Sequence, residues 1–158
     1  MRRPPCPAHP VRQPRLPELS WRTPRTARRT GGLEAEQLSI RLLEVQDPAD
    51  FLFGAGGDQL APGERAGVVH TEVTNTGTTA FGYLPDDFLE LVTAEGTAVA
   101  KAPVSLTSRP PRRIGVGPGQ TVGGHTVYVL PGSARLASVR WSTRPEPDER
   151  TVTWTVDE

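Results

Sequence analysis

Cysteine, lysine and long apolar runs are scarce in this sequence of 158 residues. Its single cysteine, Cys6, can form neither an internal disulfide nor a cysteine-rich zinc site, so it leaves the redox environment open. No stretch of about 18 apolar residues occurs, and we expect no transmembrane helix. The basic N-terminus lacks the apolar segment of roughly 7 to 15 residues that defines a signal peptide, so we also expect no export signal in it.

The formal net charge of zero hides a division of charge along the chain. Residues 1–32 hold eight arginines against one acid, Glu18, and carry a net charge of +7, which leaves −7 for residues 33–158. Because contacts with phosphates require a basic surface, we expect no nucleic-acid binding by residues 33–158. The chain therefore divides into a basic tail and a mildly acidic domain.

The tail, residues 1–32, is rich in proline and arginine and poor in apolar side chains. Such a segment cannot bury enough apolar surface to offset the entropy lost on ordering, so we expect it to be disordered. Two interpretations of its composition stay open. The tail binds polyanions through charge alone, or a misassigned start codon has added translated GC-rich non-coding DNA to the domain.

Residues 33–158 carry the signals of an antiparallel all-β domain. In the most informative stretch, 68–83, alternating residues lead into an Asn75-Thr76-Gly77 turn and a further strand. Trp141 and Trp154 are in phase with valines, which predicts core packing and a cost of about 3 to 5 kcal/mol for Trp154→Ala. The expected strands are near 36–46 with a bulge at Leu42, 65–74, 80–84, 88–94, 97–101, 120–130, around Val139 and 151–156.

This pattern predicts an immunoglobulin-like antiparallel β-sandwich of about seven to eight strands, with an eight-stranded jelly roll as the alternative. On the second of these strands, Val69, Thr71 and Val73 are expected to face the core. Asn75 and Gly77 suit a left-handed backbone in the turn that follows.

Five motifs occur in an order that resembles a bacterial family: DPADF at 47–51, Pro62-Gly63, VTNTG at 73–77, FLELVTAEG at 88–96 and PGQTVGGHTVYVLP at 118–131. Over about residues 33–158, this order resembles the immunoglobulin-like domain of unknown function related to the secreted mycobacterial immunoprotective extracellular antigens. The resemblance implies an exported β-sandwich, either free or held at the cell surface as a lipoprotein or by a membrane segment. It offers no catalytic residues. Where the family implies an export signal, this chain has its Pro/Arg-rich tail.

The long loop 47–64 is the first candidate contact surface, since loops of this length are usually functional or packed by their own side chains. It contains Phe51 and Phe53. These rings either present an apolar surface to a partner or plug the end of the sandwich. The plug is the favoured interpretation, because monomers rarely expose apolar patches.

Arg109, Arg112 and Arg113 stand among prolines and form the second candidate contact. A basic polyproline segment can bind an acidic partner. Proline and charge also block pairing at the edge of a sheet, and we favour this edge-protection interpretation.

Histidines and loop aspartates are the main candidates for chemistry. His70 and His125 fall on strand faces opposite the expected core, where we expect them to be solvated, and no GxSxG elbow accompanies them. Asp86 and Asp87 are interpreted as a solvated turn, and no EF-hand spacing supports calcium binding. We therefore expect no enzymatic activity, no metal and no cofactor.

Together these features favour a non-enzymatic immunoglobulin-like interaction module that acts outside the cytoplasm, an expectation that rests on the family resemblance. Its partner is expected to be a protein or a cell-surface component, contacted through end loops and edge strands. The alternative is a cytoplasmic polyanion-binding protein that uses the arginine-rich tail, with the sandwich as a scaffold.

Overall fold

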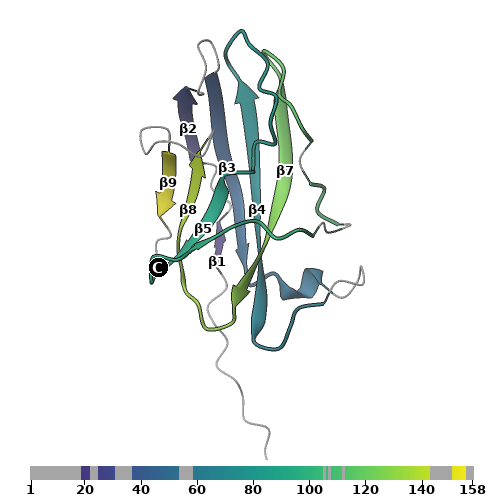
Figure 1. Cartoon of the computed structure of the whole chain (residues 1–158), viewed down its shortest axis with the longest axis vertical. Helices are drawn as coiled ribbons and strands as arrows, with labels where there is room; N and C mark the ends of the chain where they lie inside the picture. The colour runs from purple at the N-terminus through teal and green to yellow at the C-terminus, as the bar shows by residue number, and fades with distance from the viewer. Residues whose placement is uncertain are drawn as a thin grey trace, which may run out of the picture.

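The computed structural model describes residues 19–21, 25–30, 37–53, 59–104, 106, 108–111, 113–142 and 151–155, which build two antiparallel β-sheets (Figure 1). The first sheet has the order β1-β3-β4-β7, with β2 also paired to β3; the second has the order β6-β5-β8-β9. The strands are β1 (Leu19–Trp21), β2 (Arg25–Thr30), β3 (Gln37–Asp47), β4 (Glu64–Asn75), β5 (Leu89–Thr93), β6 (Ala98–Val99), β7 (Thr121–Pro131), β8 (Leu136–Ser142) and β9 (Thr151–Thr155). A 3-10 turn, η1 (Asp50–Leu52), follows β3.

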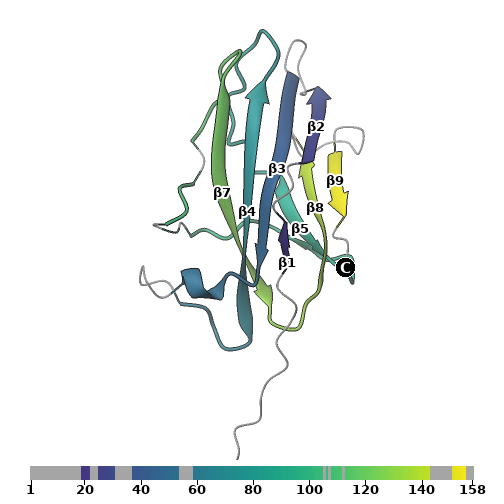
Figure 2. The same ribbon diagram turned by 180° about the vertical axis from the view of Figure 1, so that it is seen from behind.

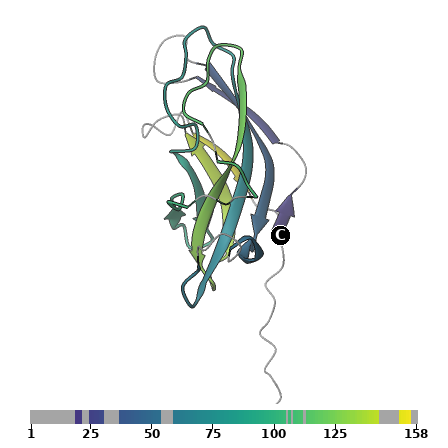
Figure 3. The ribbon, with the colours of Figure 1, turned by 90° about the vertical axis from the view of Figure 1, so that its right-hand side faces the viewer.

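The two sheets pack face to face around a hydrophobic core (Figure 3). Trp141, Tyr128 and Phe81 are its largest fully buried side chains. The Trp141 Nε1 group donates a hydrogen bond of 2.6 Å to the Pro85 carbonyl, and the Tyr128 hydroxyl donates one of 2.7 Å to the Leu89 carbonyl. The polar atoms of these rings are thus satisfied inside the core. The expected all-β, antiparallel sandwich is confirmed.

Alternation along the strands decides which side chains face this core. On β4, Val69, Thr71 and Val73 are buried between the sheets, as the period-2 pattern predicts. The pairing of β3 with β4 shifts register between Leu42 and Glu44, which is the bulge expected near Leu42. The core-facing positions of this sheet could therefore be predicted from the sequence.

A second, smaller cluster covers part of the outer face of the first sheet. Two loops bury this face, one between β3 and β4 and one between β6 and β7. Its buried members are Ala49, Ala66, Val68, Leu106 and Val127. Because β4 and β7 are covered on both faces here, their outward positions are apolar at this end of the sheet.

Two local expectations are wrong. Residues 80–84 form no strand; Phe81 makes only an isolated bridge with Val116. Gly77 does not adopt the left-handed backbone expected in the turn after β4. Instead, the Gly77 N–H donates a hydrogen bond of 2.9 Å to the Oδ1 atom of the Asn75 side chain.

The segment expected to be disordered contains β1 and β2, both paired to β3 (Figure 2). For these nine residues the structure shows paired strands where the composition predicts disorder. The physical reason is that backbone hydrogen bonds to an available strand edge require no apolar side chains. The other residues of the range 1–32 lie outside the described residues.

Candidate functional site

A strap runs along the outer edge of β7, the last strand of the first sheet. We use the name strap for residues 101–104, 106 and 108–111, which follow β6. The Ala102 N–H donates to the Val127 carbonyl at 2.7 Å, and the His125 N–H donates to the Pro110 carbonyl at 2.9 Å. The strap therefore satisfies backbone groups of β7 that would otherwise form an open edge. Of the two bonds, the one to Pro110 belongs to the Arg-Pro segment and is the kind of contact that the edge-protection interpretation predicts.

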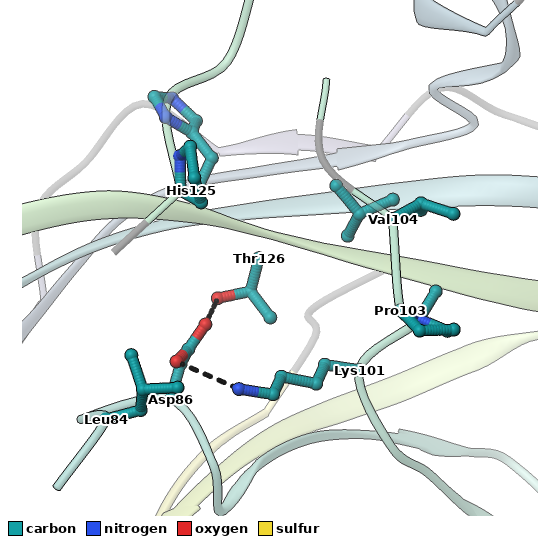
Figure 4. Close-up of a pocket in the computed structure, with 10 residues that line it drawn as sticks. Leu84, Asp86, Lys101, Pro103, Val104, His125 and Thr126 are labelled. Carbon is teal, nitrogen blue, oxygen red and sulfur yellow. Dashed lines mark hydrogen bonds and ion pairs between the residues drawn. The ribbon is translucent and has the colours of Figure 1, made fainter. Parts of the chain in front are cut away.

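A pocket of about 210 Å³ lies between the strap and β7 (Figure 4). Asp86, only 5% exposed, points into it from the loop before β5. One carboxylate oxygen of Asp86 accepts a hydrogen bond from the Thr126 hydroxyl at 2.9 Å, and the other accepts one from the Lys101 ammonium at 3.3 Å. The lining residues are Leu84, Asp86, Lys101, Ala102, Pro103, Val104, Pro111, His125, Thr126 and Val127.

The polar groups of this pocket satisfy one another. Lys101 also donates to Asp87 at 2.7 Å. Burial opposes the charge on Lys101, but the hydrogen bond to Asp87 and the charges of both aspartates outweigh it and raise the pKa of Lys101. A lysine held as ammonium is no nucleophile. The cluster is best understood as a clamp that ties the start of the strap to the loop before β5.

Asp86 is therefore not part of a solvated turn, and that expectation is wrong for this residue. Its partner Thr126 is 40 positions away in the sequence, and the pairing depends on the packing of β7 against the loop before β5. Asp87, by contrast, is exposed.

His70 and His125 form a stacked pair on the outer face of the first sheet. They are directly opposite each other on β4 and β7, and Glu44 on β3 is opposite His70 on its other side. The ring centroids are 4.1 Å apart, with 17° between the ring planes. Both rings lie away from the core, as expected, but both are half-buried and not fully solvated.

The environment of His125 favours its neutral form. Burial is the largest cause of its lowered pKa, and the charges of His70 and Arg109 act in the same direction. The hydrogen bond with Pro110 and the charge of Glu44 oppose this shift. Within the described residues, no three His, Cys, Asp or Glu side chains are grouped so that they could hold a metal ion.

A second feature is the loop tip, which we define as residues 79–84 and 113–117. The Phe81 and Val116 backbones form the bridge that joins these two segments, and the Gly115 N–H donates to the Tyr83 carbonyl at 3.1 Å. Tyr83 is 49% exposed and Ile114 is 72% exposed. Ile114 is thus largely exposed, and Tyr83, whose ring packs against Phe81, is half exposed, on neighbouring, hydrogen-bonded segments.

Asn75, at the end of β4, anchors the loop tip. This side chain is fully buried, and its amide nitrogen donates to the Thr79 and Val116 carbonyls, each at 2.8 Å. Its backbone carbonyl accepts a hydrogen bond from the Gly119 N–H at 2.9 Å. One side chain therefore fixes both segments of the loop tip.

The structure separates the residues proposed as partner contacts. Phe51 is 67% exposed, so it is no plug, whereas Phe53 is half-buried against the second cluster. Both follow β3 and lie near the start of β4, at the opposite end of that strand from the loop tip. Arg109 belongs to the strap beside His125, and exposed Arg113 directly precedes Ile114. Arg112 lies outside the described residues.

Reasoning from the sequence missed Tyr83 and Ile114. Tyr83 was missed because a strand was expected at 80–84, where the structure has none. Ile114 carried a usable signal, because it is a lone branched apolar residue between arginine and glycine in a proline-rich loop. Such a residue has no strand alternation to bury it.

No family model matches the sequence, and no curated protein matches it. Among solved structures, the chain is similar to a Bacillus subtilis protein described as a "putative lipoprotein" (ycdA), with a TM-score of 0.55 and 15% sequence identity. The match covers 79% of this chain and 39% of the Bacillus subtilis chain, so this chain spans well under half of that protein. The similarity concerns the fold alone. None of the described residues belongs to a helix with the length and apolar character of a membrane span.

Proposed function

We propose that this chain is a non-enzymatic binding domain of immunoglobulin-like architecture, which acts outside the cytoplasm and contacts a protein partner through its loop tip. The observation that carries the proposal is the exposure of Tyr83 and Ile114 on two segments joined by hydrogen bonds. The Gly115–Tyr83 bond places the two residues on adjoining backbone, and exposed apolar side chains that form one patch mark contact surfaces on soluble proteins.

The strand order supports the immunoglobulin-like assignment. The order β3-β4-β7 corresponds to strands A, B and E of that fold, and β6-β5-β8-β9 corresponds to C′, C, F and G. In such sandwiches the loops gather at the two ends and carry the binding residues. The family resemblance and the description of the similar Bacillus subtilis protein as a "putative lipoprotein" both favour a location at the cell surface.

The loop tip has the composition of an interface centre. Tyrosine and arginine are enriched at such centres, and full burial of an exposed large apolar side chain contributes about 1.5 to 3 kcal/mol. Because Asn75 already fixes the backbone, little conformational entropy is lost on binding. Arg113 gives the loop tip a positive charge on a domain that is otherwise acidic. The partner surface should therefore combine acidic and apolar side chains.

Photo-crosslinking from position 83 tests this proposal. Tyr83 is replaced by photoreactive p-benzoylphenylalanine, which keeps an exposed aromatic ring, and the full chain is irradiated on intact cells of its source. We expect a discrete covalent adduct with one protein, weakened by Ile114→Ser and by Arg113→Glu. The same photoreactive residue at Phe51, an exposed aromatic at the other end of β4, is the matched control.

Three outcomes would contradict the proposal: equal adducts from both positions, no protein adduct from position 83, or an adduct insensitive to Ile114→Ser. The proposed location has its own test. A tagged full chain in its source cell should be degraded by protease added to intact cells, and complete resistance would place it inside.

A further inference from the structure

The two histidines are neighbours because of their place in the sheet. The His125 backbone N–H donates to Pro110 on the strap and so points away from β4. His70 and His125 are therefore a pair without hydrogen bonds between their backbones, the type in which opposite side chains come closest. This explains the 4.1 Å between their ring centroids.

His125 holds the strap twice. Besides its backbone N–H, its ring Nδ1 lies 3.3 Å from the Pro110 carbonyl oxygen. Because a carbonyl can only accept, a hydrogen bond in this contact requires the proton on Nδ1. In the neutral ring, Nε2 then carries no proton. The strap is thus fixed by Pro110 at one end and by Ala102 and Lys101 at the other.

Charged groups approach this pair from each packed element. Arg109 comes from the strap and Glu44 from β3. Glu72 on β4 lies near Gly123, as His70 does, and forms an ion pair of 3.2 Å with Arg41 on β3. Burial, His70 and Arg109 oppose a positive charge on His125, whereas Pro110 and Glu44 favour it. The opposing influences outweigh the favourable ones, so the pKa of His125 is lowered. Lifting the strap removes burial and Arg109, which oppose the charge, together with the Pro110 hydrogen bond, which favours it; burial is the largest of the three.

We propose that His125, stacked on His70, forms a pH-sensitive latch, which keeps the strap on the edge of β7 while the His125 ring is neutral and lets the strap lift when that ring is protonated. An imidazolium ion needs hydration, and lifting the strap exposes His125 to water and removes Arg109 from its side. A positive charge on His70 also opposes one on His125 at this distance. Since the closed state binds protons more weakly, protons must favour the open one.

The consequence of opening is a free strand edge. The Val127 carbonyl and the His125 N–H would lose their strap partners and become available to an extended peptide segment. The latch therefore controls a second surface that is distinct from the loop tip and does not depend on the function proposed for it.

Amide hydrogen exchange of the full chain, followed by NMR at about pH 7.5 and about pH 5, tests the latch, because histidine titrates between these values. Exchange rates are first divided by their intrinsic values at each pH. We expect protection of the His125 and Ala102 amides to fall about tenfold or more on acidification, while the Leu91 amide in β5 stays unchanged. Constant protection at His125, or a parallel fall at Leu91, would overturn the proposal.

Two variants separate the latch from a general effect of acid. In His125→Asn, the amide nitrogen can replace Nδ1 as donor to Pro110 but does not titrate, so the acid-induced loss of protection at position 125 should disappear. In His70→Phe, the stacked ring remains without its charge, and the loss should become smaller. A wild-type response in His125→Asn would refute the latch. If that variant does not fold, the His70→Phe comparison decides in the same way.

Discussion

Leucine in place of Asp47 is expected to destabilise the protein strongly, because Asp47 is half of a buried ion pair. Arg65 donates from Nε and Nη2 to the two carboxylate oxygens at 2.7 and 2.9 Å, and from Nη1 to the Pro131 carbonyl at 2.8 Å. Asp47 is 4% exposed and Arg65 is 5% exposed. The hydrogen bond with Asp47 is the largest cause of the raised pKa of Arg65, and burial opposes it. The pair joins the end of β3 to the turn after β7.

Without Asp47, the guanidinium charge stays buried with two of its donors unpaired. Removing one partner of such a pair costs about 3 to 5 kcal/mol, which is a large part of the roughly 5 to 15 kcal/mol that stabilises a typical domain. Replacing both partners removes the uncompensated charge. The double variant Asp47→Leu with Arg65→Met should therefore cost less than Asp47→Leu alone, at about 2 kcal/mol or below, since only the bonds to Pro131 and Gly132 are then lost.

Urea denaturation near neutral pH, followed by tryptophan fluorescence, measures the two single variants and the double variant. We predict that the effects of the single substitutions do not add, with a coupling energy of about 2 kcal/mol or more. A cost of less than about 1 kcal/mol for Asp47→Leu, or a cost of the double variant equal to the sum of the two single costs, would refute the role of the ion pair.

Three further predictions concern the core, the loop tip and acid. Trp154→Ala should lower the free energy of unfolding by about 3 to 5 kcal/mol in urea, because its ring is buried, whereas exposed Thr153→Ala should change it by less than about 0.5 kcal/mol. Asn75→Ala should cost about 2 to 3 kcal/mol and speed amide exchange at Phe81, since the buried Val116 carbonyl and the half-buried Gly77 N–H lose their partner; unchanged exchange there would contradict this role. Because the pKa of His125 is lowered in the folded state, the stabilising contribution of its neutral ring should be complete above the ordinary histidine pKa of 6.5. This contribution should disappear as the pH falls through the lower pKa of the folded state. Urea midpoints should therefore fall on acidification less steeply in His125→Asn than in the wild type.

The strands could be predicted because their signals are local. Alternation over a few residues suffices to place Val69, Thr71 and Val73 in the core, and a change of phase suffices to locate the bulge after Leu42. Trp154 is buried in phase with its valine neighbour for the same reason. Each of these predictions depends only on which residues share one face of a single strand.

The candidate sites depend on relations that no single strand contains. The stacking of His70 and His125 requires that β4 and β7 be neighbours in one exact register. Burial of Asp86 requires that its loop cross from one sheet to the other beside Thr126. Composition and spacing identify the outward face of each strand but not the neighbouring ring or the strap that covers it, which is why they led to solvated side chains at these positions.

The segment from Arg109 to Ile114 connects the two proposed surfaces, and its hydrogen bonds determine how far they are coupled. At one end Pro110 is held by His125; at the other, Gly115 is held by the Tyr83 carbonyl. The loop tip is also held by the Asn75 side chain, which donates hydrogen bonds to the Val116 and Thr79 carbonyls. Neither of these two bonds involves the strap. Lifting the strap therefore breaks the bonds at Pro110 without removing those that shape the loop tip. Binding through Tyr83 and Ile114 should persist while the β7 edge opens, which makes the two surfaces energetically separable although they share one short segment of chain.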